Sequence, residues 1–206
     1  VTGSGKTQVY IESIRRALTA GKGAIVLVPE ISLTPQAVSR FQSSFGLDVA
    51  VMHSRLSAGE RLDAWKRVRE GRARVVVGAR SAVFAPVKNL GLIVVDEEHE
   101  SSYKQNDPAP RYHARDVAVM RAKLCGAVTV LGSATPSTET YFNALRGKYH
   151  LLELPHRIDG VPMPAVEIVD LARQRRVMRG EQVVLSPLMR RSIEERLARR
   201  EQIILL

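Results

Sequence analysis

The sequence has little cysteine, few aromatic residues and no long hydrophobic run. Its single cysteine, Cys125, excludes a disulfide within the chain and a cysteine-rich zinc site, and we expect its thiol to be packed. No run of about 18 apolar residues is present, so we expect no membrane-spanning helix and no membrane partner. Aromatic residues make up only 5% of the 206 residues, so any stacking on nucleic-acid bases would fall to few side chains.

Acidic residues are outnumbered by basic ones. The chain has 31 Lys and Arg against 21 Asp and Glu, which gives a net charge of +10. This excess favours a polyanionic partner such as nucleic acid. A solvated arginine-rich surface explains the same charge equally well, so charge alone does not decide.

Short apolar runs alternate with amphipathic stretches through most of the chain. The runs are rich in Val, Ile and Leu with little alternation, which is typical of parallel strands covered on both faces. They span 23–28, 48–52, 73–77, 90–95 and 127–131. The stretches between them predict helices at 5–19, 34–43, 58–69, 113–123 and 137–145. This order predicts an α/β domain with a mostly parallel sheet flanked by helices.

The character of the chain changes after Leu154, where prolines break the pattern and a polar, arginine-rich segment follows. A helix is predicted from Ser186 to Arg200, with Ser186 as its cap, and 201–206 is predicted as a strand. We therefore expect a first domain, a connecting region and the start of a second domain, at 1–154, 155–185 and 186–206.

The chain opens on the residues of a phosphate-binding loop without its first glycine: Val1-Thr2-Gly3-Ser4-Gly5-Lys6-Thr7. Small residues let backbone N–H groups approach phosphates closely, so we expect 2–7 to bind a nucleotide. Lys6 would reach the β- and γ-phosphates, and the Thr7 hydroxyl would bind magnesium. A flexible glycine–serine turn is the alternative. The missing glycine and its supporting strand indicate a fragment that begins inside its own nucleotide site.

A buried strand runs directly into Asp96-Glu97-Glu98-His99. Clustered carboxylates at the tip of such a strand are unfavourable unless a cation lies there. We therefore expect Asp96 to be the outer partner of magnesium and Glu97 to be the base that polarises the attacking water. An acidic turn on a solvated loop is the alternative.

The segment from Gly132 to Ser137 follows another buried strand. Its hydroxyl residues Ser133 and Thr135 are expected to hydrogen-bond His99 or Glu98 and so to link the phosphates to more distant parts. A plain strand-to-helix turn with a hydroxyl cap is the alternative, and the two interpretations are compatible.

The three motifs, VTGSGKT, DEEH and GSATPS, occur in the order found in superfamily 2 helicases, and the chain resembles that superfamily. The text between the motifs is more specific. It contains LVPEISLTPQ, GARSAVFAP with Ala79 in place of the usual threonine, ESSYKQ and RYHARD. Over nearly the whole chain these segments are similar to the PriA family (primosomal protein N′) of bacterial replication-restart helicases.

The resemblance implies a RecA-like helicase lobe, followed by the start of a second lobe, in an ATP-dependent 3′-to-5′ DNA helicase that remodels stalled forks for primosome assembly. It also implies residues that contact the DNA backbone: Pro29, Thr34, Gln36, Arg80 and Ser81. The stretch 101–115 would be an aromatic-rich loop that senses single-stranded DNA. In that loop tyrosines would stack on bases and cations would meet phosphates, and these residues are Tyr103, Tyr112, Lys104, Arg111 and Arg115. A polar connection whose tyrosines cover the core edge is the alternative.

The cofactors implied are ATP and Mg²⁺, and the partners are single-stranded and forked DNA, other primosome proteins and single-strand-binding protein in the bacterial cytoplasm. Zinc belongs to the full-length family protein, and none is expected here. Second-lobe motifs, including an arginine finger, are not visible, so we expect the isolated fragment to be inactive or very weak. The alternatives are another superfamily 2 translocase or, for the fragment alone, a nucleotide- or DNA-binding module without turnover.

Overall fold

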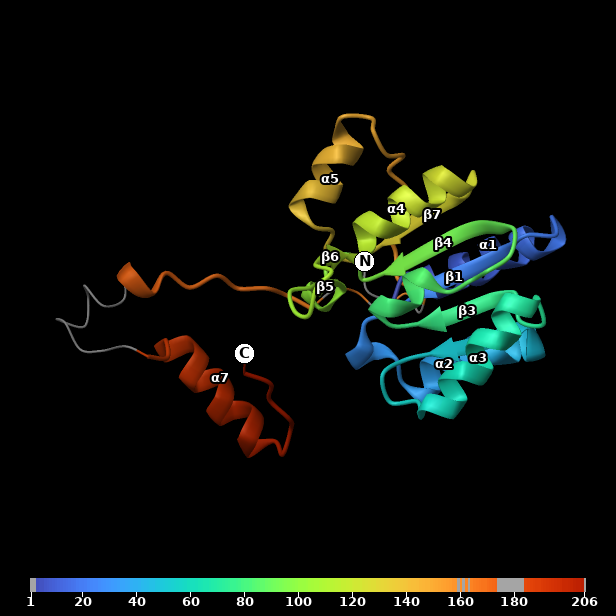
Figure 1. Ribbon diagram of the computed structural model, residues 1–206. Helices are drawn as coiled ribbons and strands as arrows, with labels where there is room; N and C mark the ends of the chain where they lie inside the picture. The colour runs from blue at the N-terminus through green and yellow to red at the C-terminus, as the bar shows by residue number, and fades with distance from the viewer. Residues whose placement is uncertain (1–2, 159, 161, 163, 174–183, 206) are drawn as a thin grey trace. The chain divides into compact units, whose positions relative to one another are not determined.

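The computed structural model describes residues 3–158, 160, 162, 164–173 and 184–205. The chain divides into two units, Val1–Val161 and Pro162–Leu206, and the first contains the predicted α/β domain (Figure 1). The assignment of 1–154, 155–185 and 186–206 to a lobe, a connection and a second lobe stays a prediction.

A five-stranded sheet in the order β2-β3-β1-β4-β7 forms the centre of the first unit. Every neighbouring pair in it is parallel, as the continuous apolar runs predict. The observed strands agree with the predicted ones within two residues at each end: β1 Gly23–Leu27, β2 Val49–Met52, β3 Val75–Gly78, β4 Leu90–Asp96 and β7 Val128–Gly132. The predicted fold, a RecA-like α/β lobe with a mostly parallel sheet, is confirmed.

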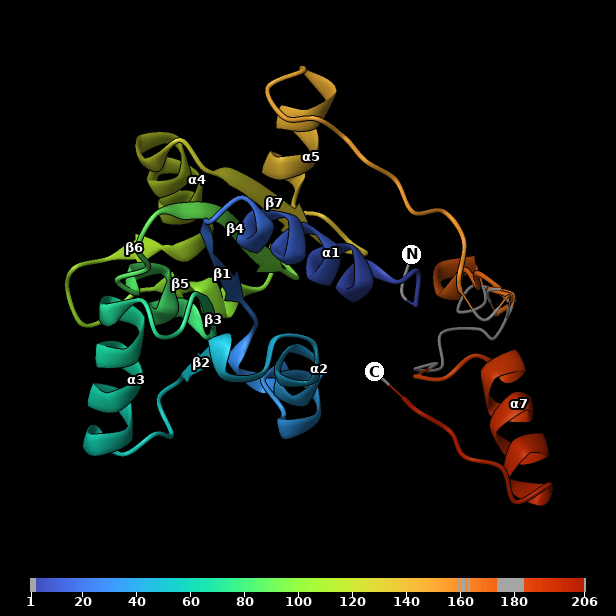
Figure 2. The same ribbon diagram turned by 90° about the vertical axis from the view of Figure 1, so that its right-hand side faces the viewer.

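Helices cover both faces of the sheet. The helices on these faces are α1 Lys6–Thr19, α2 Pro35–Phe45, α3 Ala58–Glu70 and α4 Ala114–Cys125, whereas α5 Thr138–Leu145 follows β7 and has no buried residue. On one face α1 and α2 bury Ile14 and Phe41, and on the other α3 and α4 bury Val68 and Ala118. Figure 2 shows α3 and α4 to the left of the sheet and α1 and α2 to its right. Cys125, at the end of α4, is exposed, so the expectation of a packed thiol was wrong.

Short elements follow several strands. The 3₁₀ turn η3 (Arg80–Phe84) comes after β3, and η4 (Ser101–Tyr103) comes after β4. The predicted aromatic-rich loop then forms a two-stranded antiparallel ribbon of β5 (Lys104–Gln105) and β6 (Tyr112–His113). The ribbon leads directly into α4. The predicted loop therefore has regular secondary structure and is continuous with α4.

The second unit contains α7 (Pro187–Ala198), whose first turn is capped by the Ser186 hydroxyl as predicted. Residues 201–205 form no strand, which contradicts that prediction. An apolar run becomes a strand only beside a hydrogen-bonding neighbour, and the described residues of this unit include no other strand. Leu206 lies outside the described residues.

Candidate active site

The phosphate-binding loop leads into α1, and Gly5 is the residue that caps the helix. Gly3 and Gly5 have φ of 79° and 87°, a backbone conformation that favours glycine. The backbone carbonyl of Gly5 accepts hydrogen bonds from the N–H groups of Gln8 and Val9, which fixes the first turn. The positive end of α1 therefore faces the loop. The expected role of Thr2 falls on a residue outside the described ones.

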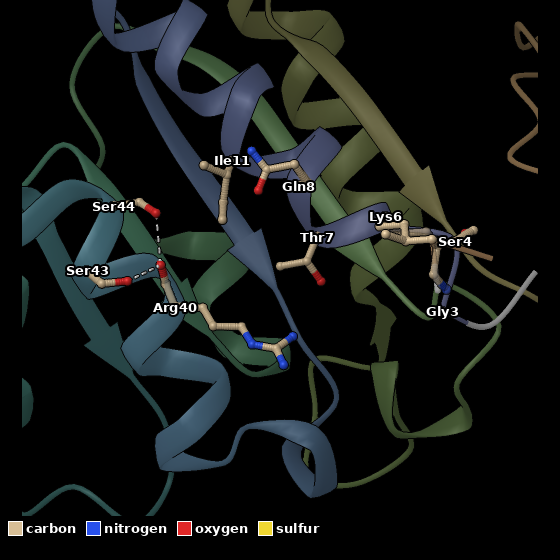
Figure 3. Close-up of a pocket in the computed structure, with 11 residues that line it drawn as sticks. Gly3, Ser4, Lys6, Thr7, Gln8, Ile11, Arg40, Ser43 and Ser44 are labelled. Atoms are coloured by element: carbon tan, nitrogen blue, oxygen red, sulfur yellow. Dashed lines mark hydrogen bonds between the residues drawn. The ribbon is translucent and has the colours of Figure 1, made fainter. Parts of the chain in front are cut away.

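A cavity of about 580 Å³ opens at this loop (Figure 3). It is lined by Gly3 to Gln8 and Ile11, by Ile158, and by three residues of α2: Arg40, Ser43 and Ser44. The Ser4 hydroxyl is buried without a hydrogen-bond partner in the described part of the chain. Backbone donors, a lysine and an unpaired hydroxyl fit a nucleotide phosphate chain. No local pattern marks the α2 residues, because only the packing of α2 beside α1 brings them to the cavity.

The predicted catalytic residues lie together at the end of β4. Lys6 Nζ is 2.7 Å from Glu97 Oε1, and the Tyr10 hydroxyl donates to Asp96 Oδ1 at 2.9 Å. The Tyr103 hydroxyl donates to the backbone carbonyl of Asp96 at 2.7 Å. The structure thus joins Lys6 and Asp96 to the same carboxylate cluster, although they are 90 positions apart in the sequence.

Burial raises the pKa of Asp96, while the Tyr10 hydrogen bond and the Lys6 charge act in the opposite direction. Burial, and then the charge of Asp96, raise the pKa of Tyr10 as well, so the phenol remains a donor. Gly132 makes this contact possible, because a Cβ at that position would collide with the Tyr10 hydroxyl. The glycine of GSATPS therefore leaves room for a side chain from α1.

His99 and Ser133 form the link that the sequence predicts. Their Nδ1 and Oγ atoms are 2.8 Å apart, and Ser133 Oγ lies 3.5 Å from Glu97 Oε2. The Thr135 N–H donates to Ser133 Oγ at 2.9 Å, and Thr135 Oγ1 lies 3.5 Å from His99 Nε2. The chain of contacts runs from Glu97 through Ser133 to His99 and Thr135. Glu98 has other partners.

Glu98 is 1% exposed and lies in a buried network with Arg115, Ser137 and Thr140. Its carboxylate accepts from the Ser137 N–H at 2.7 Å, the Thr140 hydroxyl at 2.8 Å and the Arg115 guanidinium at 3.1 Å. Burial alone would raise the pKa of Glu98, but these hydrogen bonds outweigh it and the pKa is lowered. The network ties the end of β4 to the starts of α4 and α5.

Three residues expected to contact DNA have buried or occupied side chains. The Arg115 side chain is 14% exposed and is held by Glu98 and Asp116, so its guanidinium is not free for a phosphate. Tyr103 is 1% exposed, so a base cannot stack on it. Pro29 is buried too. The sequence pattern did not distinguish these side chains from exposed ones, because packing between elements decides their burial; for Tyr103 and Arg115 those elements include α4.

The other expected DNA contacts lie in three segments: the start of α2, η3 and the β5–β6 segment. Thr34 and Gln36 are exposed at the start of α2, where the Thr34 hydroxyl also caps the helix. Arg80 lies against the β5–β6 ribbon, donates to the Lys104 carbonyl at 2.9 Å and has its guanidinium 6.0 Å from the centre of the Tyr112 ring. The remaining residues, Ser81, Lys104 and Arg111, are exposed. The structure therefore joins Arg80 to the predicted aromatic-rich loop.

Comparison with known proteins identifies the family of this chain. Residues 1–143 match the family model described as DEAD/DEAH box helicase. The chain belongs to the DEAD/DEAH box helicase family. It is 53% identical over 205 residues to the replication restart protein PriA of Bacillus subtilis (strain 168), covering 100% of this chain and 25% of that protein. PriA of Chlamydia muridarum (strain MoPn / Nigg) is 49% identical over 205 residues, which cover 100% of this chain and 27% of the relative.

This helicase chain therefore spans about a quarter of the length of the curated relatives it matches. The resemblance to PriA that the sequence predicts is confirmed. Among solved structures, RecG bound to a three-way DNA junction has a TM-score of 0.49 and 25% identity, covering 70% of this chain and 18% of that one. The Pyrococcus furiosus Hef helicase domain has a TM-score of 0.47 and 23% identity, covering 70% and 31%.

The helicase family uses nucleotide and magnesium, and the residues present fit both. In the described part of the chain no group of three or more His, Cys, Asp and Glu side chains could hold a metal ion. Magnesium commonly takes only one or two protein ligands and completes its shell with phosphate and water oxygens. Thr7 and Asp96 would suffice for that.

No helix among the described residues is long and apolar enough to cross a bilayer.

Proposed function

We propose that the chain is the first RecA-like lobe of an ATP-dependent DNA helicase that moves 3′ to 5′ and remodels stalled forks for primosome assembly and replication restart. The observation that carries this proposal is the meeting of Lys6, Asp96 and Glu97 beside the phosphate-loop cavity. The direction of movement and the action on forks rest on the family resemblance. Single-stranded and forked DNA, primosome proteins and single-strand-binding protein would be its partners, in the bacterial cytoplasm.

Each site residue has a distinct task in ATP hydrolysis. The Lys6 ammonium would bind the β- and γ-phosphates, and Thr7 and Asp96 would hold Mg²⁺, which supplies positive charge that neutralises the phosphates. Glu97 orients the attacking water and accepts its proton. In this structure the Lys6 ammonium is paired with Glu97 at 2.7 Å. A triphosphate must draw Lys6 away from Glu97, so nucleotide binding itself releases the base.

The contacts of Ser133 connect the catalytic base Glu97 to the loop that follows β7. Ser133 is within hydrogen-bond reach of both Glu97 and His99, and Thr135 bonds to the same hydroxyl. A displacement of the loop after β7 therefore moves a neighbour of the catalytic base. This is the coupling role that we assign to His99, Ser133 and Thr135.

ATP hydrolysis by the intact protein, with and without single-stranded or forked DNA, tests the proposal. We expect DNA to raise the rate, and we expect Lys6→Ala to abolish hydrolysis. Glu139, an exposed acid on α5, supplies the control variant Glu139→Gln, which should behave as wild type. Phosphoryl transfer to a small metabolite without any need for DNA would contradict the helicase proposal. Hydrolysis that DNA stimulates, combined with movement in a direction other than 3′ to 5′, would indicate another superfamily 2 translocase.

For the 206-residue chain alone, a nucleotide-binding module without turnover is the second candidate. Lys6 and Arg40 are the cationic side chains lining the cavity in the described part of the chain. Phosphoryl transfer in such motors usually needs a further arginine, whose loss lowers the rate by about 10³–10⁵. A nucleotide titration combined with a hydrolysis assay on the chain alone separates binding from turnover.

A further inference from the structure

Phe84 is exposed although its neighbours in the chain are buried. Its side chain is 55% exposed, whereas Ala82, Val83 and Ala85 are each 2% exposed or less. Phe84 ends η3, so the core packing of the turn presents the ring to solvent. Single exposed apolar residues are common, so exposure alone assigns no role.

Arg121 holds the backbone around Phe84, and Tyr112 supports its ring. The Arg121 guanidinium, on α4, donates to the carbonyl of Val83 and, at 2.8 Å, to the carbonyl of Ala85, the two residues that flank Phe84. Tyr112 packs edge to face against the ring, with centroids 5.1 Å apart and planes at 73°. A ring fixed in this way loses little conformational freedom when a ligand stacks on it.

Three cations lie on or next to the short segments that carry this aromatic pair, η3 and the β5–β6 ribbon. Arg80 lies 6.0 Å from the centre of the Tyr112 ring and donates to the Lys104 carbonyl, so it ties η3 to the β5–β6 ribbon. The Lys104 and Arg111 side chains are exposed and have no hydrogen-bond or ion-pair partner among the described residues. We call Phe84, Tyr112, Arg80, Lys104 and Arg111 the aromatic–cation surface.

We propose that Phe84 is a stacking platform for a base of single-stranded DNA, with Tyr112 as its support and Lys104 and Arg111 as contacts for the neighbouring phosphates. An exposed aromatic ring, on segments that also carry unpaired cations, matches both parts of a nucleotide: the π face of the base and the negative charge of the backbone. A net charge of +10 favours the same polyanion. The inference rests on the proposed DNA-dependent function and adds a residue outside the predicted aromatic-rich loop.

The test compares two oligonucleotides of equal length and equal charge, oligo(dT) and a strand that is abasic at every position, by fluorescence anisotropy at fixed salt on the intact protein. For oligo(dT), we expect Phe84→Ala to raise Kd about 5- to 150-fold, the range for loss of one stacked base. Phe84→Trp should bind as wild type, and Phe84→Leu should resemble Phe84→Ala. For the abasic strand, all variants should lie within about twofold of wild type, because no base is present to stack.

Leu47→Ala is the matched control, since Leu47 is 86% exposed and lies in η2 (Gly46–Asp48), outside the aromatic–cation surface. It should change neither Kd. Phe84→Ala should still unfold cooperatively, at a temperature slightly below that of wild type, because its ring is half exposed and packs on Tyr112. Unchanged oligo(dT) binding by Phe84→Ala, or an equal loss on the abasic strand, overturns the inference while wild-type DNA binding stands. A ring that instead packs against a protein segment would show the first result. Wild-type protein that binds neither strand would overturn the proposed function as well.

Discussion

The nucleotide site and the aromatic–cation surface are organised in opposite ways. In the nucleotide site the polar side chains satisfy one another: the Lys6 ammonium pairs with Glu97, and the neutral Tyr10 hydroxyl donates to Asp96. At the aromatic–cation surface the bonds go to backbone carbonyls, from Arg80 within it and from Arg121 behind Phe84, and the Phe84, Lys104 and Arg111 side chains remain exposed. A ligand at the nucleotide site must replace hydrogen bonds and ion pairs between protein side chains, whereas a ligand at the aromatic–cation surface meets side chains that are already exposed. The first arrangement suits a regulated reaction and the second suits capture of a strand.

The largest expected effect is at the base of the nucleotide site. Glu97→Gln keeps the size of the side chain but removes the proton acceptor, so single-turnover ATP hydrolysis should fall about 10²- to 10⁴-fold. Nucleotide affinity should persist, because Lys6 is freed from its pairing partner. Rapid-quench hydrolysis together with equilibrium nucleotide titration measures the two effects. A rate within a factor of about three of wild type would show that another group is the base.

Arg115 and Arg111 sharpen the comparison. They lie four positions apart, but Arg115 is paired with buried Glu98 and Arg111 is exposed. Arg115→Ala leaves the Glu98 carboxylate buried without its cation, which should lower the free energy of unfolding by about 3–5 kcal/mol. Urea denaturation measures this. Glu98→Gln in the Arg115→Ala background should recover part of the loss, since it removes the unpaired charge. Wild-type stability of Arg115→Ala, with loss of DNA affinity alone, would instead return this arginine to the DNA contacts.

A smaller effect is expected at the glycine that admits Tyr10. Gly132→Ala places a methyl group against the Tyr10 hydroxyl and should lower the free energy of unfolding by about 1–3 kcal/mol. Tyr10→Phe should relieve part of this cost in the double variant, so the two changes should not be additive. Gly59→Ala is the control, because a Cβ at that position meets nothing within 4 Å. Additive losses would mean that Tyr10 does not limit the space at Gly132.

The smallest effect is expected at the exposed cation. Arg111→Ala should leave stability within about 0.5 kcal/mol of wild type. It should weaken DNA binding and lower the slope of log K against log salt by about one, as loss of a single phosphate contact does. Binding titrations at several salt concentrations give that slope. An unchanged slope would remove Arg111 from the phosphate contacts.

The sequence predicted the features that depend on local pattern. Continuous apolar runs located the strands, and the two motifs that contain Lys6 and Asp96-Glu97 were enough to place these residues at one site. Features set by packing between distant elements were not predicted. The burial of Tyr103 and the pairing of Arg115 depend on how β4, α4 and α5 meet, and the role of Arg40 depends on the packing of α2 beside α1.

The exposure of Phe84 could not be predicted from the sequence either. Within GARSAVFAP it is one apolar residue in an apolar stretch, and nothing in the letters separates it from Val83. Only the 3₁₀ turn, which buries Val83 and exposes Phe84, distinguishes the two. The apolar run at 201–205 likewise has strand composition, but a strand also needs a paired neighbour.

ATP hydrolysis by the intact protein as a function of single-stranded DNA concentration tests the division of labour between the two regions most directly. The account predicts that Glu97→Gln hydrolyses little ATP at any DNA concentration. It predicts that Phe84→Ala reaches the wild-type maximal rate but needs about 5- to 150-fold more DNA to do so. A Phe84→Ala protein with wild-type DNA dependence, or a wild-type protein whose hydrolysis does not respond to DNA, would contradict it.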